Sequence, residues 1–565
     1  MGETYENASD RKSYVGTIFN KGSDLTKKEI LDSLPKEWSD LHTKGYIYIH
    51  DLNAYGTTYN CLNFSILNKF PFDELNQYND TLKILEIFGH FRNIIAKMAN
   101  EQSGGMGFAN FDEDISTIFD KLHIEHSEKN MELLSASILS FIRWINGVHE
   151  RCGLTSYYVT LNLGLSTNTL GQKVTEYVLT SFRMAGPKVF KPNIVFKVKE
   201  GINLKKSDPN YYLLELALAT TCEKMIPTYV LCDCESNKKY NPKNLSVMGC
   251  RTRVVQNIFG EPTGIGRGNI ANITINLPRI ALDINAAYPS VETEQKISLF
   301  LEKWKEIAAT AVNILLDRYK KLISMDKIYF PTNMAFDLWT GGFLAAASLE
   351  EIFRNGTQAL GFIGLSETIE ILIGSPYYET TFGTELALKI VREMRAYTNN
   401  LINIYNLNFS LLATAGEQIS GSLPEKDCKY YDHPVLKKGF YTNSFHVNVD
   451  SGLTPFEKIE KEGPFHTLCN GGCISYVEFS SAPISNTEAL YELICHGINC
   501  GIHYLGFNFP IDVCNKCGEK GIFDICDSCG SKDITRIRRV SGYLEILDYF
   551  TSGKKNEVKN RKSNN

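Results

Sequence analysis

Two patterns of apolar residues divide the chain into segments of different kinds. In NDTLKILEIFGHFRNIIAKMANEQ, residues 79–102, apolar positions recur every three or four residues, and the helical pattern continues to about residue 150. YIYIHDL at residues 46–52 alternates and predicts a short strand, and the β-rich stretches at residues 156–166 and 192–201 predict further strands. Both patterns continue to about residue 505 without a Ser-, Gly- or Pro-rich linker. We therefore expect one large α/β domain.

Length and composition suit a globular protein with a large core. The 565 residues are 43% hydrophobic and 22% charged, and a formal net charge of −5 with a pI near 6.2 disfavours a nucleic-acid partner. No apolar run is long enough to span a bilayer. The start, MGETYENASDRKSYVG, has neither an apolar signal core nor the hydroxyl residue of a myristoylation site at position 6. We expect a soluble cytoplasmic protein with no membrane partner.

Most cysteines and histidines of the chain do not form a recognisable site. The 15 cysteines are an odd number and mostly scattered, so a disulfide framework fits poorly. HIEH at residues 123–126 has metal-like spacing but no third ligand nearby, and we interpret it as a solvated helix face. The cysteines interpreted as small buried hydrophobic residues are Cys152, Cys222, Cys495 and Cys500.

Four cysteines near the C-terminus are different. CNKCGEKGIFDICDSCG places Cys514, Cys517, Cys526 and Cys529 in two C-x2-C pairs, whose thiolates can close a tetrahedral metal site. Because a four-cysteine site leaves no open position for a substrate, we expect a zinc ion that organises the fold. An iron–sulfur cluster or a rubredoxin-like iron is an alternative on the same ligands.

RRVSGYLEIL, residues 538–547, places Gly542 shortly after these cysteines. Glycine tolerates positive φ and close backbone approach, so a turn is the ordinary interpretation. A second interpretation is a radical left by removal of one Cα hydrogen, which the flanking amide groups share and which can flatten because there is no Cβ. Cys61 in YNCLNF and Cys250 in SVMGCRTRVV also have two interpretations, as inert core thiols or as reactive groups. The other motifs of the chain decide between them.

The combination of motifs resembles one family. RVSGY follows a four-cysteine site, and MGCRT, GRGN, TINLPRIAL, FYTNSFHV and CNGGCISYVEF lie upstream. Together they resemble the anaerobic (class III) ribonucleoside-triphosphate reductases of the glycyl radical enzyme superfamily, over most of the chain. The resemblance implies a ten-stranded α/β barrel of two antiparallel five-stranded halves. It also implies a catalytic barrel with N-terminal helices at residues 1–505, a zinc-binding region at 506–535, and a glycyl radical loop with a flexible tail at 536–565.

The resemblance assigns roles to six residues, carried over motif by motif. They are Gly542 as the radical store, Cys250 as the residue that becomes a thiyl, Cys61 as the second catalytic cysteine, Asn269 of GRGN as an asparagine of formate-using members, Met248 as the methionine beside the thiyl, and Glu417 of TAGE as the acidic residue of a family TPAE segment. The TAGE segment differs from TPAE in its two middle residues.

The chemistry that the resemblance implies is reduction of ribonucleoside triphosphates with formate as the reductant. A separate activating enzyme with a [4Fe-4S] cluster and S-adenosylmethionine would install the glycyl radical. Family members are dimers that respond to deoxynucleotide effectors, and we expect the effector site in the helices after residue 79. Many relatives begin with an ATP-cone domain, and because the motif of Cys61 comes so early in this sequence we expect no ATP-cone here.

Two other functions are open alternatives. Pyruvate formate-lyase shares RVSGY but uses two adjacent cysteines and lacks the zinc knuckle, and no Cys-Cys dipeptide occurs in this chain. A zinc-ribbon protein that docks a partner or a nucleic acid is the second alternative. The acidic charge balance and the large α/β body argue against it.

Overall fold

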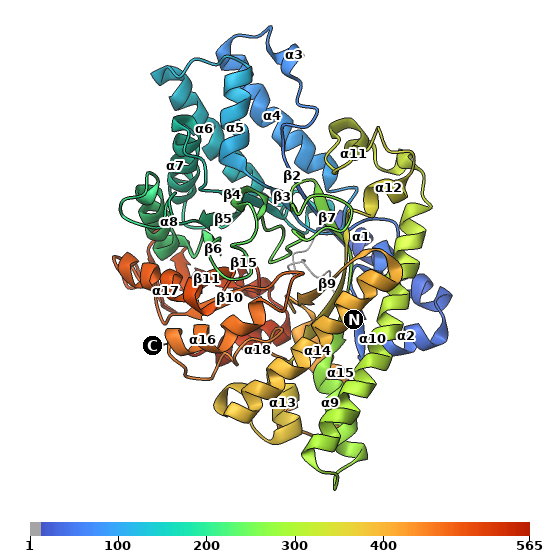
Figure 1. Cartoon of the computed structure of the whole chain (residues 1–565). Coiled ribbons are helices and arrows are strands. Elements are labelled where there is room, and N and C mark those ends of the chain that lie inside the picture. Colours follow the sequence, from blue (N-terminus) through green and yellow to red (C-terminus); the bar gives the residue numbers. More distant parts are fainter. Residues whose placement is uncertain (1–12, 565) are drawn as a thin grey trace.

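A sheet of eleven strands forms the centre of the computed structural model, which describes residues 13–564 (Figure 1). The strands of its first half are parallel to one another and almost wholly buried, which explains apolar runs such as NIVFKV. They are β2 (Cys61–Phe64), β3 (Met106–Phe108), β4 (Val159–Leu163), β5 (Asn193–Val198) and β6 (Thr228–Leu231).

The second half has two groups of parallel strands. They are β7 (Arg267–Asn276), β8 (Thr357–Ile363) and β9 (Asn408–Ala413), and then β10 (Ser475–Glu478) and β11 (Tyr504–Asn508). The halves meet in the antiparallel pairs β2–β7 and β6–β11, and β1 (Ile47–Ile49) pairs with the far end of β7.

The segment before β10 closes the sheet against β9. Gly471 donates its N–H to the Leu411 carbonyl at 2.9 Å, and Ala413 donates to the Gly472 carbonyl at 3.1 Å. The expected ten-stranded barrel of two antiparallel halves is therefore confirmed, with β1 as an added strand.

Helices surround the barrel (Figure 1), and several of them, such as α5, α10, α14 and α16, pack directly on its strands. α4 shows why they form, because the Asn79 side chain accepts the N–H of Leu82 at its start and apolar residues recur along its buried face. The helices in chain order are α1 (Tyr14–Ser33), α2 (Lys36–Thr43), α3 (Phe72–Leu75), α4 (Asp80–Met98), α5 (Phe111–Lys121), α6 (Glu128–Ile145), α7 (Thr169–Met184), α8 (Tyr211–Lys224), α9 (Leu277–Ala287), α10 (Thr293–Ile323), α11 (Pro331–Phe336), α12 (Leu349–Phe353), α13 (Leu365–Ile373), α14 (Thr381–Tyr405), α15 (Ile419–Asp427), α16 (Pro455–His466), α17 (Thr487–Cys500) and α18 (Ser552–Asn560).

The structure corrects several local predictions. The helical segment after residue 79 is interrupted by β3, because a strand of three residues is too short to show a period of two. HIEH lies in the turn between α5 and α6, where His123 has a φ of 52° and both histidines are exposed. Of the four cysteines expected to be buried, the structure buries Cys222, half-buries Cys495 and Cys500, and exposes Cys152.

The last part of the chain forms a second sheet of four strands in the order β13–β12–β14–β15. Barrel strand β11 ends at Asn508, beyond the expected boundary at 505. β12 of the four-cysteine region pairs with β14 of the radical loop, so these two regions share one sheet. The strands are β12 (Ile511–Cys514), β13 (Lys520–Gly521), β14 (Ile534–Arg539) and β15 (Leu544–Ile546).

The expected flexible tail is instead the packed helix α18. Lys554 and Glu557 are buried and form an ion pair, and Glu557 also pairs with Arg561 at 2.7 Å. A Cβ on Gly553 would lie 2.3 Å from the Gly421 Cα, so the paired glycines let α18 approach α15 closely. The polar composition of the segment predicted flexibility, because composition does not show that α18 packs against α15.

None of the helices described for residues 13–564 is long and apolar enough to cross a bilayer. The start of the chain, residues 1–12, in which the sequence shows no signal core, lies outside the described residues.

Candidate active site

A tight loop between β6 and β7 presents Cys250 to the interior. Met248 and Thr252 exchange backbone hydrogen bonds of 3.3 and 3.2 Å, and Gly249 between them has a φ of +58°, which residues with a side chain rarely adopt. Asn162 of β4 holds the stem of the loop through hydrogen bonds of 2.9 and 3.0 Å to its backbone. Cys250 therefore lies at the tip of a turn that is anchored to the barrel, and we call residues 248–252 the Cys250 loop.

The turn between β14 and β15 brings Gly542 against this loop. Val540 donates its N–H to the Tyr543 carbonyl at 2.9 Å and closes the turn. A Cβ on Gly542 would lie 1.8 Å from the Cys250 Cβ and 2.5 Å from its Cα, and the φ of Gly542 is outside the left-handed region. Contact with Cys250, rather than the geometry of the turn, therefore requires glycine here. We call residues 534–546 the radical hairpin, after the role that the resemblance implies for Gly542.

Side chains hold the hairpin and the loop together. Arg251 is 1% exposed and donates from Nη2 to the Ser541 Oγ at 2.8 Å. Asn443 also approaches the Ser541 Oγ, at 3.2 Å. Ser541 thus lies between the Cys250 loop and the loop that follows α15, so the position of Gly542 depends on polar contacts as well as on packing.

Cys61 approaches the same point from β2. Its thiol donates to the Asn60 Oδ1 at 2.8 Å and accepts the N–H of Gly105 at 3.1 Å, and its side chain packs against Met248. Burial raises the pKa of Cys61, and burial together with the charge of Glu417 raises the pKa of Cys250 to about 12. Both groups are therefore thiols at neutral pH, which keeps the S–H bond that hydrogen-atom transfer needs.

Tyr158 and Glu417 complete the wall beside Cys250. Glu417 lies between β9 and α15 and lines the same cavity as both cysteines. Tyr158 also lines it, and its ring meets that of Tyr543 edge-on with centroids 5.3 Å apart. The TAGE motif placed Glu417 at the site, whereas Tyr158 stands in a strand-like stretch without a signal that distinguishes it from a core residue.

The structure does not place Asn269 in the wall of this cavity. Asn269 lies opposite Cys61 in the β2–β7 pair, but it is 1% exposed and its Nδ2 donates to the Thr357 carbonyl of β8 at 2.9 Å. Asn272 lines the cavity instead, and its buried Oδ1 has no donor among the described residues. Asn60 is a second amide in the wall. Neither stood out in the sequence, because isolated asparagines are common in turns and strand ends.

The four cysteines near the C-terminus have the geometry of a tetrahedral site. Their Sγ atoms all lie within 4.8 Å of one another, and the Cys514–Cys529 and Cys517–Cys526 pairs are 3.6 and 3.5 Å apart. A tetrahedron with zinc–sulfur bonds of about 2.3 Å requires sulfur atoms about 3.8 Å apart. The four thiols therefore fit a zinc ion, which would link β12 to the turns before β14.

Comparisons with known proteins show the family of the chain. The family model for anaerobic ribonucleoside-triphosphate reductase matches residues 6–563. The protein of that name from Enterobacteria phage T4 is 28% identical, with 98% of this chain and 96% of its own length covered. The one from Escherichia coli (strain K12) is 29% identical, with 94% of this chain and 78% of its own length covered.

Solved structures show the same fold at lower identity. An anaerobic ribonucleotide reductase superposes with a TM-score of 0.73 at 15% identity, covering 98% of this chain and 90% of its own. The enzyme from Thermotoga maritima in complex with dATP and CTP has a TM-score of 0.68 at 14% identity, covering 96% and 90%. With a family match along almost its whole length, the chain belongs to the anaerobic ribonucleoside-triphosphate reductases.

Proposed function

We propose that the chain reduces ribonucleoside triphosphates to 2′-deoxyribonucleoside triphosphates through a glycyl radical at Gly542 and a thiyl radical at Cys250. The observation that carries the proposal is the direct contact of Gly542 with Cys250, beside a cavity that Cys61 also lines. The family match supports the reaction, and the contact supports these residues as its carriers.

The reaction needs three transfers that these side chains can make. The Gly542 radical takes the hydrogen atom of the Cys250 thiol, and the resulting thiyl takes the hydrogen atom from C3′ of the ribose. Once the 2′-hydroxyl group has left as water with the proton of the 3′-hydroxyl group, Cys61 gives its hydrogen atom to C2′. The hydrogen atom of formate then restores the Cys61 thiol, and the remaining electron with one proton reduces the 3′-ketone as formate leaves as carbon dioxide. The closed cavity holds these groups within reach and excludes bulk solvent, which limits side reactions of the radicals.

We propose formate as the reductant. One formate and one proton convert one ribonucleotide into one deoxyribonucleotide, one carbon dioxide and one water, so electrons and atoms balance. Formate is a small anion, which neutral amide donors can orient without an unpaired buried cation. Asn60 and Asn272 in the cavity wall are the residues in position to do so, and Asn269 would act from behind the wall.

Installation of the radical requires a partner and a movement. Gly542 is buried against Cys250, so we propose that the radical hairpin leaves the barrel to meet a separate radical S-adenosylmethionine activase with a [4Fe-4S] cluster. A zinc ion held by the four cysteines would stiffen the sheet, since β12 and β14 are paired. The hairpin and the four-cysteine region would then move as one body.

We also propose a homodimer with deoxynucleotide effectors. α4 and the residue just before its N-cap expose the apolar residues Tyr78, Leu82 and Leu85, which recur on one helical face and are 37%, 44% and 48% exposed. An apolar stripe of this kind is typical of an interface. A Thermotoga maritima relative has dATP bound in its specificity site, and we expect deoxynucleotides to shift the substrate preference of this chain too.

The test of the proposed function is a turnover assay with anaerobically activated protein, a ribonucleoside triphosphate and labelled formate. We expect one labelled carbon dioxide for each deoxynucleotide formed. Turnover with a thioredoxin system and no formate would contradict the reductant alone. Absence of any deoxynucleotide in a sample with a verified glycyl radical would contradict the proposed activity.

A further inference from the structure

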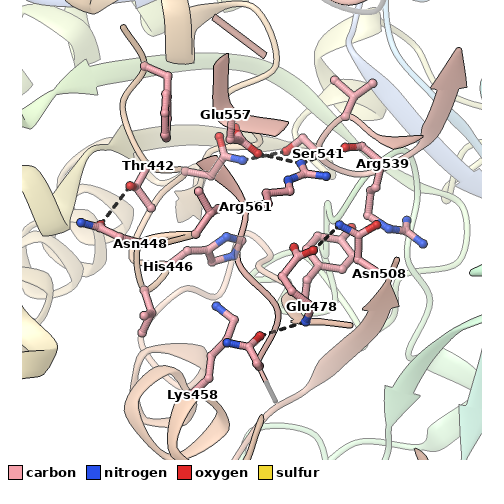
Figure 2. A pocket seen from close by; sticks show the side chains of 17 residues that line it. Thr442, His446, Asn448, Lys458, Glu478, Asn508, Arg539, Ser541, Glu557 and Arg561 are labelled. Atoms are coloured by element: carbon pink, nitrogen blue, oxygen red, sulfur yellow. Dashed lines mark hydrogen bonds and ion pairs between the residues drawn. The ribbon is translucent and has the colours of Figure 1, made fainter. Parts of the chain in front are cut away.

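A second cavity lies beside the radical hairpin, and Figure 2 looks into it. Its walls come from residues 440–449, from β10 and β11, from the hairpin and from the end of the chain around α18. It shares no lining residue with the cavity of Cys250. Ser541 connects the two, because it lines this cavity and accepts a hydrogen bond from Arg251. We call it the hairpin cavity.

Positive charge exceeds negative charge in its wall. Burial lowers the pKa of His446 well below its usual value, so this ring is neutral at pH 7. Behind the wall, Lys458 forms an ion pair with Glu462, and Glu557 forms one with Lys554. Counting Glu462 and Lys554 adds one negative and one positive charge, so the net charge of the wall does not change. The charged lining residues are the three cations Lys458, Arg539 and Arg561 and the two carboxylates Glu478 and Glu557.

Of these three cations in the wall, Arg539 is the one that has no carboxylate partner within residues 13–564. It is 1% exposed, donates from Nη2 to the Met225 carbonyl at 2.6 Å, and stacks over the Tyr476 ring at 4.8 Å. Its Nε and Nη1, and the Nε of Arg561, are buried and have no acceptor in the part of the chain that the structure describes. Buried donors of a charged group are costly without an acceptor, so a missing acceptor is expected here.

The size of the cavity limits what that acceptor can be. About 40 Å³ is open to the centres of water-sized molecules, which is far too little for a nucleotide. A few waters or one small anion fit. The planar, two-oxygen face of a carboxylate matches the fork of donors on a guanidinium. Asn448 adds an amide in the wall, whereas Asn508 Nδ2 already donates to the Glu478 carboxylate at 2.6 Å (Figure 2).

We propose that the hairpin cavity binds one small monocarboxylate, and that formate is its ligand in this enzyme. The choice of formate rests on the proposed function, whereas the anion site rests on the charge and the unmet donors of Arg539 and Arg561. Arg539 ends β14, and Arg561 follows α18 and already donates to the Arg539 carbonyl at 2.9 Å. An anion between them ties the radical hairpin to the end of the chain, so the reductant holds the hairpin in the barrel.

The test uses full-length protein that has not been activated, with sodium formate, chloride or butyrate at equal ionic strength. We expect formate to raise the unfolding temperature by about 1–2 °C at ten to a hundred times its Kd, because ligand binding to the folded state stabilises it. Formate should also slow amide hydrogen exchange in residues 540–546. Chloride has no pair of oxygen atoms to accept from the guanidinium and butyrate is too long for the cavity, so neither ion should raise the unfolding temperature or slow the exchange.

Variants on one strand provide the matched comparison. Arg539→Gln should abolish both effects of formate, whereas Arg536→Gln should keep them, because Arg536 is on the same strand but pairs with exposed Asp524. If Arg539→Gln does not fold, Arg561→Gln is the second variant. It should weaken both the rise in unfolding temperature and the slowing of amide exchange by formate.

Three results would overturn the proposal. They are an equal response to chloride, no response of the wild-type protein to formate, and an unchanged response in both Arg539→Gln and Arg561→Gln. Because no radical is involved, such a failure leaves the reductant undecided. Conversely, formate-independent turnover would contradict the reductant without changing the binding result.

Discussion

Gly542 has no side chain because Cys250 occupies the space that a side chain would need. Its φ is compatible with other residues, so the turn alone does not explain the glycine. A hydrogen atom passes between a Cα and a thiol only where the two are in contact. Gly542 and Cys250 are in such contact. The neutral state of both cysteines adds to the same conclusion, since a thiolate has no hydrogen atom to give.

The role that we propose for Cys61 leads to the first prediction. Cys61→Ser should lower deoxynucleotide formation at least about 100-fold, because the hydroxyl group is a far poorer hydrogen-atom donor and a weaker acid. The radical at Gly542 should form in normal yield, measured by electron paramagnetic resonance. Cys428→Ser, at an exposed position, is the control and should keep full activity. Turnover by Cys61→Ser at the wild-type rate would exclude Cys61 from the reaction.

The raised pKa values of the two thiols predict a pH dependence of stability. The unfolded chain releases these protons near pH 8.5, whereas folded Cys250 keeps its proton up to about pH 12 and Cys61 also titrates late. Above about pH 9 the unfolded state therefore binds fewer protons, and the free energy of unfolding falls as the pH rises. Unfolding temperatures between pH 8 and 11 should fall less steeply for the Cys61→Ala/Cys250→Ala double variant. Equal slopes would show that burial does not hold these thiols neutral.

At the scale of elements, two loops carry the residues that we propose to react, and sequence motifs lie in both loops. The Cys250 loop and the radical hairpin have strong local requirements, a left-handed Gly249 and an unsubstituted Gly542, which leave a signature in the sequence. Asn269 and Asn272 show what the motifs could not predict, which is the asparagine of β7 that faces the cavity. The register of β7 against β8 shifts between Asn269 and Ala271, and such a bulge changes which side chains face the cavity.

The shared sheet of the hairpin and the four cysteines gives the third prediction. The protein should contain about one zinc ion per chain, and Cys526→Ser should lose it. Because β12 pairs with β14, this loss should speed amide exchange in the hairpin and lower the yield of the Gly542 radical. Cys495→Ser, outside the cluster, should change neither. If metal-free protein accumulates the radical in full, the cysteines do not position the hairpin.

At the scale of the whole molecule, the barrel encloses chemistry brought from two distant parts of the chain. The Cys250 loop comes from the connection between the antiparallel halves, and the radical hairpin comes from the C-terminal sheet, with α18 packed against α15 (Figure 1). Composition and periodicity indicated a large α/β domain, and the resemblance indicated the barrel. The packing of α18 could not be predicted, because its partners lie more than 100 residues away in the sequence.

The proposed radical at Gly542 predicts what exposure to air does to the activated enzyme. Oxygen adds to a carbon radical on the backbone and the chain then breaks there, so a short C-terminal piece that begins near Tyr543 should be released. Mass spectrometry of activated protein before and after exposure to air measures it. Protein that was never activated is the control and should stay intact. An unbroken chain after verified activation would contradict a radical at Gly542.

The most direct test of the account is the electron paramagnetic resonance spectrum of the anaerobically activated protein. One hydrogen atom remains on the Cα of a glycyl radical and splits its signal, so we predict a doublet. The doublet should collapse to a singlet in protein made with α-deuterated glycine, and it should be absent from Gly542→Ala. A signal that persists in Gly542→Ala, or a doublet that deuterated glycine leaves unchanged, would contradict the assignment of the radical to Gly542.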